Sequence, residues 1–209
     1  EAAQRAKDLI RQILAFSRKD ENIITPVQIS AIVKQAVKLL RATLPRTIDI
    51  QTRITAQSER ILADLTQIHQ VIMNLCTNAY QAMRETRGVM HVELHREHLT
   101  EDSAALKQLN IPPGTYLTMS VSDTGHGMTQ DVLERIFDPY FTTKDPGKGT
   151  GMGLAVVHGI VSAIGGGITV ASELGKGTIF TVYLPPCERE AEPETVETGS
   201  VVKGRARVL

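Results

Sequence analysis

The chain has 209 residues, 42% hydrophobic and 22% charged, an ordinary composition for a globular domain. Its 23 basic residues balance its 23 acidic residues, so no net charge attracts nucleic acid or an anionic membrane, and we expect no nucleic-acid partner. No apolar run approaches the ~18 residues of a membrane span, so we expect membrane contact only through other segments. The two cysteines are distant and lack metal-ligand spacing, which favours the reducing cytoplasm.

The first 20 residues carry an apolar seam. Its side chains alternate four and three positions apart: Ala2, Ala6, Leu9, Ile13 and Phe16. This spacing is typical of a helix in a bundle or coiled coil, although a helix packed on its own domain would show the same stripe. We favour the bundle because polar residues break the seam at 19–22. By this pattern the chain begins in mid-helix, so we expect it to be part of a longer protein.

The next part of the chain predicts alternating strands and helices. Pro26 marks the first strand as an edge strand, because proline cannot donate to a ladder. Asp64, followed three residues later by Gln67, is a capping-box pattern for a long helix. The expected elements are a strand at 23–29, a helix ending near 44–45, strands at 48–54 and 60–63, and a helix from 64 to about 84.

The long helix has two distinct faces. Its apolar stripe should be buried and consists of Ile68, Ile72, Leu75, Ala79 and Met83. Asn74, Asn78 and Gln81 line up beside this stripe. Asparagine is a mediocre helix former, so two of them one turn apart require a reason. They either form a solvated polar face or direct amide oxygens at a metal-bound phosphate.

A strand at 115–122 should deliver Asp123 at its end. Three histidines, His91, His95 and His98, fall on the preceding expected strand, 89–99. On a strand His98 points away from the face that carries the other two. We therefore do not expect these histidines to bind a metal.

Thr129 can cap a short helix, and the segment after it lacks periodicity and is rich in glycine, proline, threonine and lysine. Such a segment predicts a mobile lid. The expected elements are a helix at 129–137, the lid at 137–150, a buried apolar helix at 151–163, strands at 168–173 and 178–184 joined by a glycine turn at 175–177, and an acidic linker at 188–200.

Several of these residues suit a nucleotide. A buried carboxylate such as Asp123 can accept a hydrogen bond from the exocyclic amine of adenine. Gly151 and Gly153 leave free N–H groups at a helix start, where the dipole favours phosphate. Asn78 could hold Mg²⁺ through its amide oxygen, and Lys144 or Lys148 could meet the outer phosphates. Neither a Walker-type phosphate loop nor a dinucleotide-binding glycine motif is present.

Five segments in order closely resemble the N, G1, F, G2 and G3 boxes of sensor histidine kinases. They are Asn-Leu-Cys-Thr-Asn-Ala at 74–79, Asp-Thr-Gly-His-Gly-Met at 123–128, Phe-Asp-Pro-Tyr-Phe-Thr-Thr-Lys at 137–144, Gly-Thr-Gly-Met-Gly-Leu at 149–154 and Gly-Lys-Gly-Thr at 175–178. The resemblance covers about residues 21–186, and chance agreement of five ordered boxes is very improbable.

The resemblance implies an α/β sandwich of the Bergerat ATP-binding type, a mixed sheet with helices on one face, preceded by one bundle helix. It implies that Asn78 coordinates Mg²⁺, that Asp123 reads adenine and that the lid closes over the triphosphate of ATP. Asn74, Asn78 and Lys144 would be the catalytic residues. The expected nucleotide contacts are Asn78, Gln81, Asp123, Gly125, Gly127, Met128, Phe141, Thr142, Thr143, Lys144, Lys148, Thr150, Gly151, Met152, Gly153, Leu154 and Thr178.

The resemblance also implies three regions. Residues 1–20 would be the second helix of a dimerisation and phosphotransfer bundle, 21–187 the ATP-binding catalytic domain, and 188–209 a linker toward a receiver domain of a hybrid kinase. The expected partners are a second copy of the protein and a response-regulator receiver domain, which we expect in the same polypeptide. The expected location is cytoplasmic.

Two features depart from the family pattern. The family often has a basic residue three positions after the Mg²⁺ asparagine, where this chain has Gln81; Lys144, Lys148 or Arg84 could supply that charge. The acceptor histidine is also missing, because the first histidine is His69, in the wrong element. We therefore do not expect the chain alone to phosphorylate itself.

The residue one turn before Asn78 separates reaction types. Gyrase-like ATPases place there a glutamate that activates water, whereas this chain has Asn74, whose amide is not a base near neutral pH. The absence of that glutamate would protect the γ-phosphoryl group for transfer to a histidine. The alternatives are a gyrase-type ATPase and a non-catalytic dimerising adaptor.

Overall fold

The computed structural model describes residues 23–84, 87–144 and 149–187, which form an α/β sandwich. The expected bundle helix at 1–20 and the expected linker at 188–209 lie outside these residues. The elements are β1 (Thr25–Gln28), α2 (Ile29–Thr43), β2 (Ile48–Ile54), β3 (Arg60–Ala63), α3 (Leu65–Ala82), β4 (Gly88–Leu99), α4 (Ala104–Gln108), β5 (Gly114–Asp123), α5 (Gln130–Leu133), α6 (Gly153–Ala163), β6 (Gly167–Glu173) and β7 (Gly177–Leu184).

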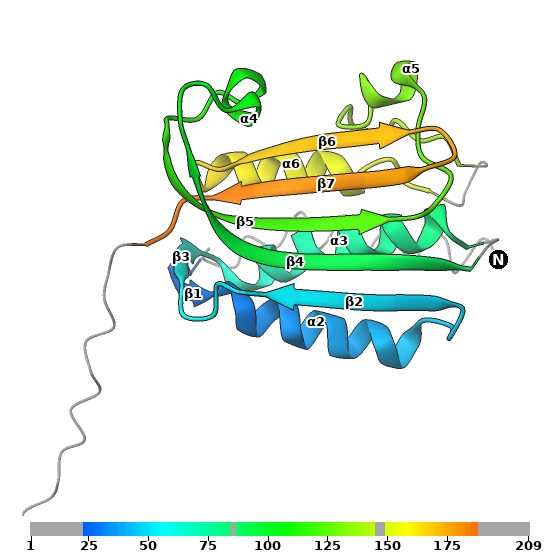
Figure 1. The fold of residues 1–209 in the computed structure, drawn as a ribbon, viewed down its shortest axis with the longest axis horizontal. Coiled ribbons are helices and arrows are strands. Elements are labelled where there is room, and N and C mark those ends of the chain that lie inside the picture. The colour runs from blue at the N-terminus through cyan, green and yellow to red at the C-terminus, as the bar shows by residue number, and fades with distance from the viewer. Residues whose placement is uncertain (1–22, 85–86, 145–148, 188–209) are drawn as a thin grey trace, which may run out of the picture.

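The main sheet has five strands in the order β2-β4-β5-β7-β6. β2 pairs with β4 in parallel, and the other neighbours pair antiparallel. Helices α2, α3 and α6 lie behind one face of this sheet, and no described element covers most of its other face (Figure 1). The expected mixed sheet with helices on one face is thereby confirmed.

The first part of the described chain follows the sequence prediction closely. β1 and β3 form a separate antiparallel pair, in which Pro26 lies opposite Leu62. α2 ends at Thr43, shortly before Pro45, as the conformational restriction before proline requires. Its apolar side packs against the sheet and α3 and consists of Ile29, Ile32, Val33, Ala36, Val37 and Leu40.

Helix α3 is the element that links the core to the polar residues predicted above. The Asp64 carboxylate caps its first turn, accepting from the N–H groups of Thr66 at 2.7 Å and Gln67 at 3.1 Å. The predicted stripe is buried throughout, with Ile72, Leu75 and Met83 fully enclosed. Burial of that stripe fixes the rotation of the helix, so the polar residues beside it are held at the edge of the core.

Two predicted helices differ from the structure. The helix expected at 129–137 is only the single turn of α5, and the Thr129 side chain does not cap it. Turns replace the helix after Leu133, where the N–H of Arg135 donates to the carbonyl of Val132 three residues back at 3.0 Å, although Ile136 is buried and Phe137 packs against the core. The helix expected to be buried all round, α6, buries only Val157 and Val161, since it packs on α3 and β6 along one side alone.

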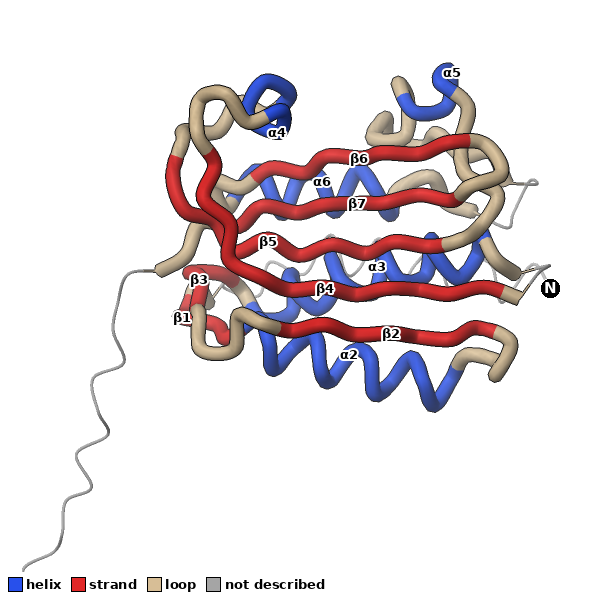
Figure 2. Tube along the Cα trace, viewed as in Figure 1, coloured by secondary structure: helices blue, strands red, loops and turns tan. Residues whose placement is uncertain are grey.

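A small second cluster forms where β4 and β5 extend past the other strands. The excursion between them carries α4 and lies at one end of the sheet (Figure 2). Leu99, Tyr116 and Tyr183 are buried there, with Leu109 packed against them. The Tyr116 hydroxyl donates to the carbonyl of Pro112 at 2.7 Å, which fixes the excursion. None of the helices in the described ranges is both long and apolar enough to cross a bilayer.

Candidate nucleotide-binding site

Asp123 lies at the end of β5 and is 7% exposed. Its carboxylate accepts a hydrogen bond from the N–H of Gly125 at 2.8 Å. Burial raises the pKa of Asp123, and hydrogen bonds from the backbone of Gly125 and Thr178 oppose that shift. The central strand of the sheet therefore presents a desolvated carboxylate acceptor at its end, as the sequence predicted.

The turn after Asp123 is wedged between α3 and the β6–β7 hairpin. The N–H of His126 donates to the carbonyl of Ala82 at 3.2 Å, and the N–H of Gly175 donates to the carbonyl of His126 at 2.7 Å. Gly127 has φ of 64°, and a Cβ there would lie 2.0 Å from the carbonyl oxygen of Glu173. Only glycine fits this position, so the turn is held by its neighbours.

Ser172 completes the turn and was not predicted from the sequence. Its hydroxyl accepts from the N–H of Met128 at 2.9 Å and donates to the carbonyl of Gly177 at 3.0 Å. It also lies 2.9 Å from the Thr178 hydroxyl. A serine next to the glycine hairpin was the available signal, but its partner Met128 is 44 residues away in the sequence.

Asn74 connects α3 with the start of α6. Its amide nitrogen donates to the carbonyl of Gly153 at 3.2 Å, and Gly153 is the first residue of α6. The predicted residue of the N box thus positions the predicted phosphate-binding turn. An amide in this role orients a backbone group and offers no base to a water molecule.

Asn78 and Gln81 direct their amide oxygens at the Lys144 ammonium. Its Nζ lies 3.5 Å from Asn78 Oδ1 and also donates to Gln81 Oε1. Partial burial of the ammonium lowers the pKa of Lys144, although the residue as a whole is exposed. Two neutral oxygens that converge on one cation are suitable ligands for Mg²⁺, which prefers a few protein oxygens and completes its shell with phosphate and water.

The backbone around Tyr140 is joined to Gly151, on the far side of the segment predicted as a lid. The N–H of Tyr140 donates to the carbonyl of Gly151 at 3.0 Å. Gly151 has φ of 66°, and a Cβ there would lie 2.4 Å from the carbonyl carbon of Tyr140. The two ends of the segment therefore meet. Its middle, with Lys148, lies outside the described residues, so the lid and the role of Lys148 remain predictions.

Other residues of this segment are held by side-chain contacts. The Arg135 guanidinium stacks over the Phe141 ring, 4.4 Å from its centre. The Thr142 hydroxyl accepts from the N–H of Lys144 at 3.2 Å, and Thr143 is exposed. The Thr150 hydroxyl accepts from the N–H of Met152 at 3.4 Å, directly before α6.

The structure brings the predicted residues together in two groups. The first surrounds the end of β5 and contains Asp123, Gly125, Gly127, Met128 and Thr178. The second lies between α3 and α6 and contains Asn74, Asn78, Gln81, Lys144 and Gly153. Met152 and Leu154 flank the start of α6 and are half-buried. Helix α3 also borders the first group, since its Ala82 carbonyl accepts a hydrogen bond from the N–H of His126.

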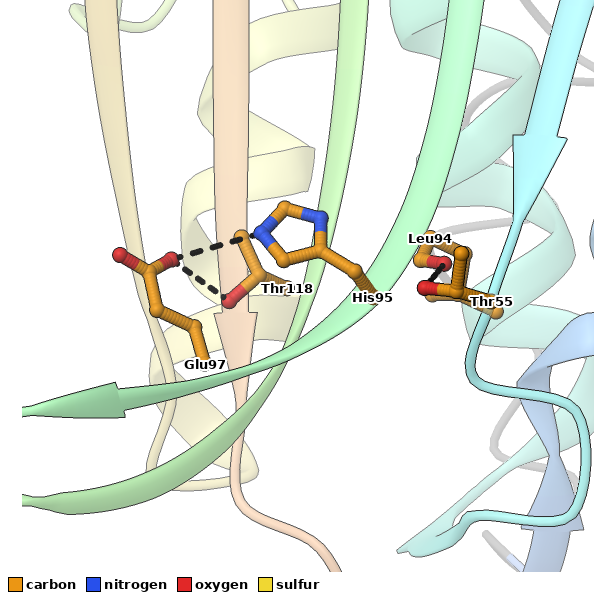
Figure 3. Close-up of polar contacts among 5 residues, drawn as sticks. All are labelled: Thr55, Leu94, His95, Glu97 and Thr118. Carbon is orange, nitrogen blue, oxygen red and sulfur yellow. Dashed lines mark hydrogen bonds and ion pairs between the residues drawn. The ribbon is translucent and has the colours of Figure 1, made fainter.

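The uncovered face of the sheet carries a shallow polar groove, away from both groups. Here the imidazole of His95 lies 3.7 Å from the Glu97 carboxylate, which also accepts from the Thr118 hydroxyl at 3.2 Å (Figure 3). His91 lines the same groove, whereas His98 lies 3.1 Å from the Thr115 hydroxyl. In the ranges that the structure describes, no three histidine, cysteine or acidic side chains are arranged to hold a metal.

Comparison with known proteins agrees with this geometry. The chain belongs to the family of histidine kinase-, DNA gyrase B- and HSP90-like ATPases, whose sequence model matches residues 63–188. Its relatives place it among the sensor histidine kinases within that family. The sensor kinase CckA of Brucella abortus is 37% identical over 99% of this chain and 23% of its own length. The sensor histidine kinase ZraS of Escherichia coli K12 is 34% identical over 92% of this chain and 37% of its own length.

Solved structures share the fold. Full-length ShkA in complex with AMPPNP superposes with a TM-score of 0.66 and 26% identity, over 86% of this chain and 35% of ShkA. The mycobacterial sensor histidine kinase MprB superposes with a TM-score of 0.62 and 18% identity, over 78% of this chain and 98% of MprB. The chain spans only 23% and 37% of the two curated relatives, so it corresponds to one part of such kinases.

Proposed function

We propose that this chain binds Mg-ATP and supplies the γ-phosphoryl group to a histidine of its parent kinase. The observation that carries the proposal is the convergence of the Asn78 and Gln81 oxygens on a cation, beside the start of α6. A buried acceptor, Asp123, suits the base, and the turn after it meets α3 at Ala82, next to Gln81. These are the two ends of a nucleotide site.

Each residue would have one task. Asp123 would accept a hydrogen bond from the exocyclic amine of adenine, while the N–H groups at the start of α6 would face the phosphates. Asn78 would hold Mg²⁺, with Gln81 and Lys144 beside it. When bound, the metal neutralises charge on the transferring phosphoryl group. Positioning of the phosphates by these residues supplies the rest of the catalysis.

Asn74 favours phosphoryl transfer over hydrolysis. Its side chain donates to Gly153 and contains no group that is basic near neutral pH, so water at this site is not activated. The γ-phosphoryl group is thereby preserved for an imidazole nucleophile. A gyrase-type ATPase is the second candidate, supported by the shared family, and for such an enzyme Asn74→Glu should change little.

The partners follow from the relatives. Because two of them are sensor kinases, we propose that the parent protein dimerises through a bundle that includes residues 1–20 and passes its phosphoryl group to a response-regulator receiver domain. We also propose that this receiver follows residue 209 in a hybrid kinase. The site would work in the cytoplasm, where ATP is available.

The test uses the chain extended upstream to include an acceptor histidine. Radiolabelled ATP should yield an acid-labile, base-stable phosphoprotein, with little steady release of phosphate. Rapid steady hydrolysis without phosphoprotein would favour the ATPase. Calorimetry that detects no Mg-ATP binding, with Asp123→Asn behaving as wild type, would instead favour a non-catalytic dimerising adaptor.

A further inference from the structure

Lys144 reaches from the segment after Phe141 to helix α3. Its ammonium contacts Gln81 and lies 3.5 Å from Asn78 Oδ1. Asn78 and Gln81 are three positions apart on α3, so their side chains lie on the same side of the helix. The N–H of Lys144 also donates to Thr142 Oγ1 at 3.2 Å.

The charge of Lys144 is not matched by a described carboxylate. None of the ion pairs between described residues involves it, and its two partners on α3 are neutral amides. An amide dipole orients an ammonium but leaves its full positive charge available to an anion. Among the described residues, the lysine thus brings a positive charge without a paired carboxylate to the oxygen that is proposed to hold Mg²⁺.

Two cations that contact the same amide oxygen repel each other, so each binds the oxygen more weakly than it would alone. Like charges a few ångströms apart repel more strongly near a protein surface than in bulk water, and the double charge of Mg²⁺ increases this repulsion. A ligand that takes the Asn78 oxygen must therefore displace the ammonium from it. Gln81 offers a second oxygen to which the ammonium can remain bound.

We propose that Lys144 and Mg²⁺ share Asn78. In the nucleotide-free protein the ammonium contacts both Asn78 and Gln81; when Mg-ATP binds, the metal takes the Asn78 oxygen and the ammonium remains on Gln81, facing the phosphates. Gln81 is then a positioning residue that acts through Lys144. This inference rests on the proposed ATP site and adds an internal cation that competes with the metal.

The proposal predicts how strongly Mg²⁺ improves ATP binding. Calorimetry would measure the dissociation constant of ATP in EDTA and in saturating Mg²⁺ at equal ionic strength. In Lys144→Gln the Mg²⁺-free affinity should fall about ten-fold, since a phosphate-facing charge is lost, and the improvement by Mg²⁺ should rise at least about five-fold. Lys107→Gln, which removes a charge in α4 at the far end of the sheet, should change neither value.

A double-mutant cycle tests the role of Gln81. Gln81→Leu removes the second oxygen and should weaken Mg²⁺-free binding by about three-fold in the wild-type background. In the Lys144→Gln background the same change should have no further effect, because Gln81 acts only through the lysine. Independent, additive effects of the two substitutions would overturn this role. Circular dichroism would confirm that each variant is folded.

The two proposals fail in different ways. A wild-type chain that does not bind ATP with or without Mg²⁺ would overturn both the proposed function and this inference. A wild-type chain that binds Mg-ATP, with the same Mg²⁺ improvement in Lys144→Gln as in wild type, would overturn only the sharing of Asn78. In that case the lysine would be an ordinary phosphate contact.

Discussion

Burial of the charged Asp123 carboxylate destabilises the folded protein, and the same carboxylate is proposed to bind the base. Burial raises the pKa of its carboxyl above the ordinary value of 3.8. A raised pKa in the folded protein means that the folded state binds the proton more tightly than the unfolded chain does. The free energy of unfolding is therefore highest at low pH for this group, and it falls as the pH rises past the raised pKa.

Asp123→Asn should separate stability from binding. At pH 7 the variant should unfold at the same denaturant concentration as wild type or a higher one, because it no longer buries a charge. The difference should shrink as the pH is lowered past the raised pKa of the aspartate. ATP affinity should fall about 10- to 100-fold, the value of a hydrogen bond to a charged acceptor. A variant that loses stability at neutral pH and regains it in acid would contradict this account.

Asn78 is the residue proposed to connect the protein to the metal. Asn78→Ala removes its amide oxygen from a half-buried helix position, where alanine is an excellent helix former. We expect the thermal midpoint to change little and phosphotransfer at limiting Mg²⁺ to fall about 10- to 100-fold. Asn110→Ala, in the excursion beyond α4, is the matched control and should retain full phosphotransfer. Near-wild-type phosphotransfer by Asn78→Ala would exclude the metal role.

Roles for these single residues could be predicted from the sequence because their chemistry and order are local. Asp123 follows an alternating strand, and Asn78 follows Asn74 by one helical turn, so each could be assigned from its own segment. The contact between Lys144 and Gln81 joins positions 63 residues apart, and three chain segments meet at Ser172. Such contacts depend on how elements pack, which no local pattern encodes.

At the scale of elements, the predicted strands and the long helices agree with the structure, whereas α5 is shorter than predicted and α6, present where predicted, is less buried. A strand whose apolar and polar residues alternate, or a helix with a single apolar stripe, shows in its sequence which side faces the core. The α6 sequence is apolar on nearly every side, so its composition does not say which side faces the core. Of the α6 residues, only Val157 and Val161 are buried, and the remaining apolar side chains of the helix are partly exposed.

Gly127, in the turn after Asp123, and Gly159, in α6, give a matched test of that turn. Gly127→Ala should lower the free energy of unfolding by about 2 kcal/mol or more, because its φ is 64° and the Glu173 carbonyl blocks a Cβ. Gly159→Ala, in exposed α6 with no atom within 4 Å of its Cβ, should raise it by about 0.5 to 1 kcal/mol. Urea titration of both variants measures this. Equal changes in the free energy of unfolding of the two variants would show that the turn can accommodate a Cβ at position 127.

At the scale of the whole molecule, α3 is both the crossover and the border of the site. β2 and β4 are parallel neighbours, so the chain must cross the sheet between them, and it does so through β3 and α3. The polar face of α3 is therefore fixed by the topology of the sheet as well as by its own buried stripe. Nucleotide bound at this face should stabilise the sheet around it.

The pairing of β2 with β4 has a consequence for fragments of this protein. The family match begins at residue 63, whereas β2 and α2 precede it. A fragment 63–187 would leave the β4 ladder unpaired from Gly88 to Leu94, next to apolar surface that α2 had covered. Unpaired strands of this kind recruit other chains. We expect fragment 63–187 to aggregate during size-exclusion chromatography and fragment 23–187 to elute as a discrete species; equal behaviour would show that β2 is dispensable.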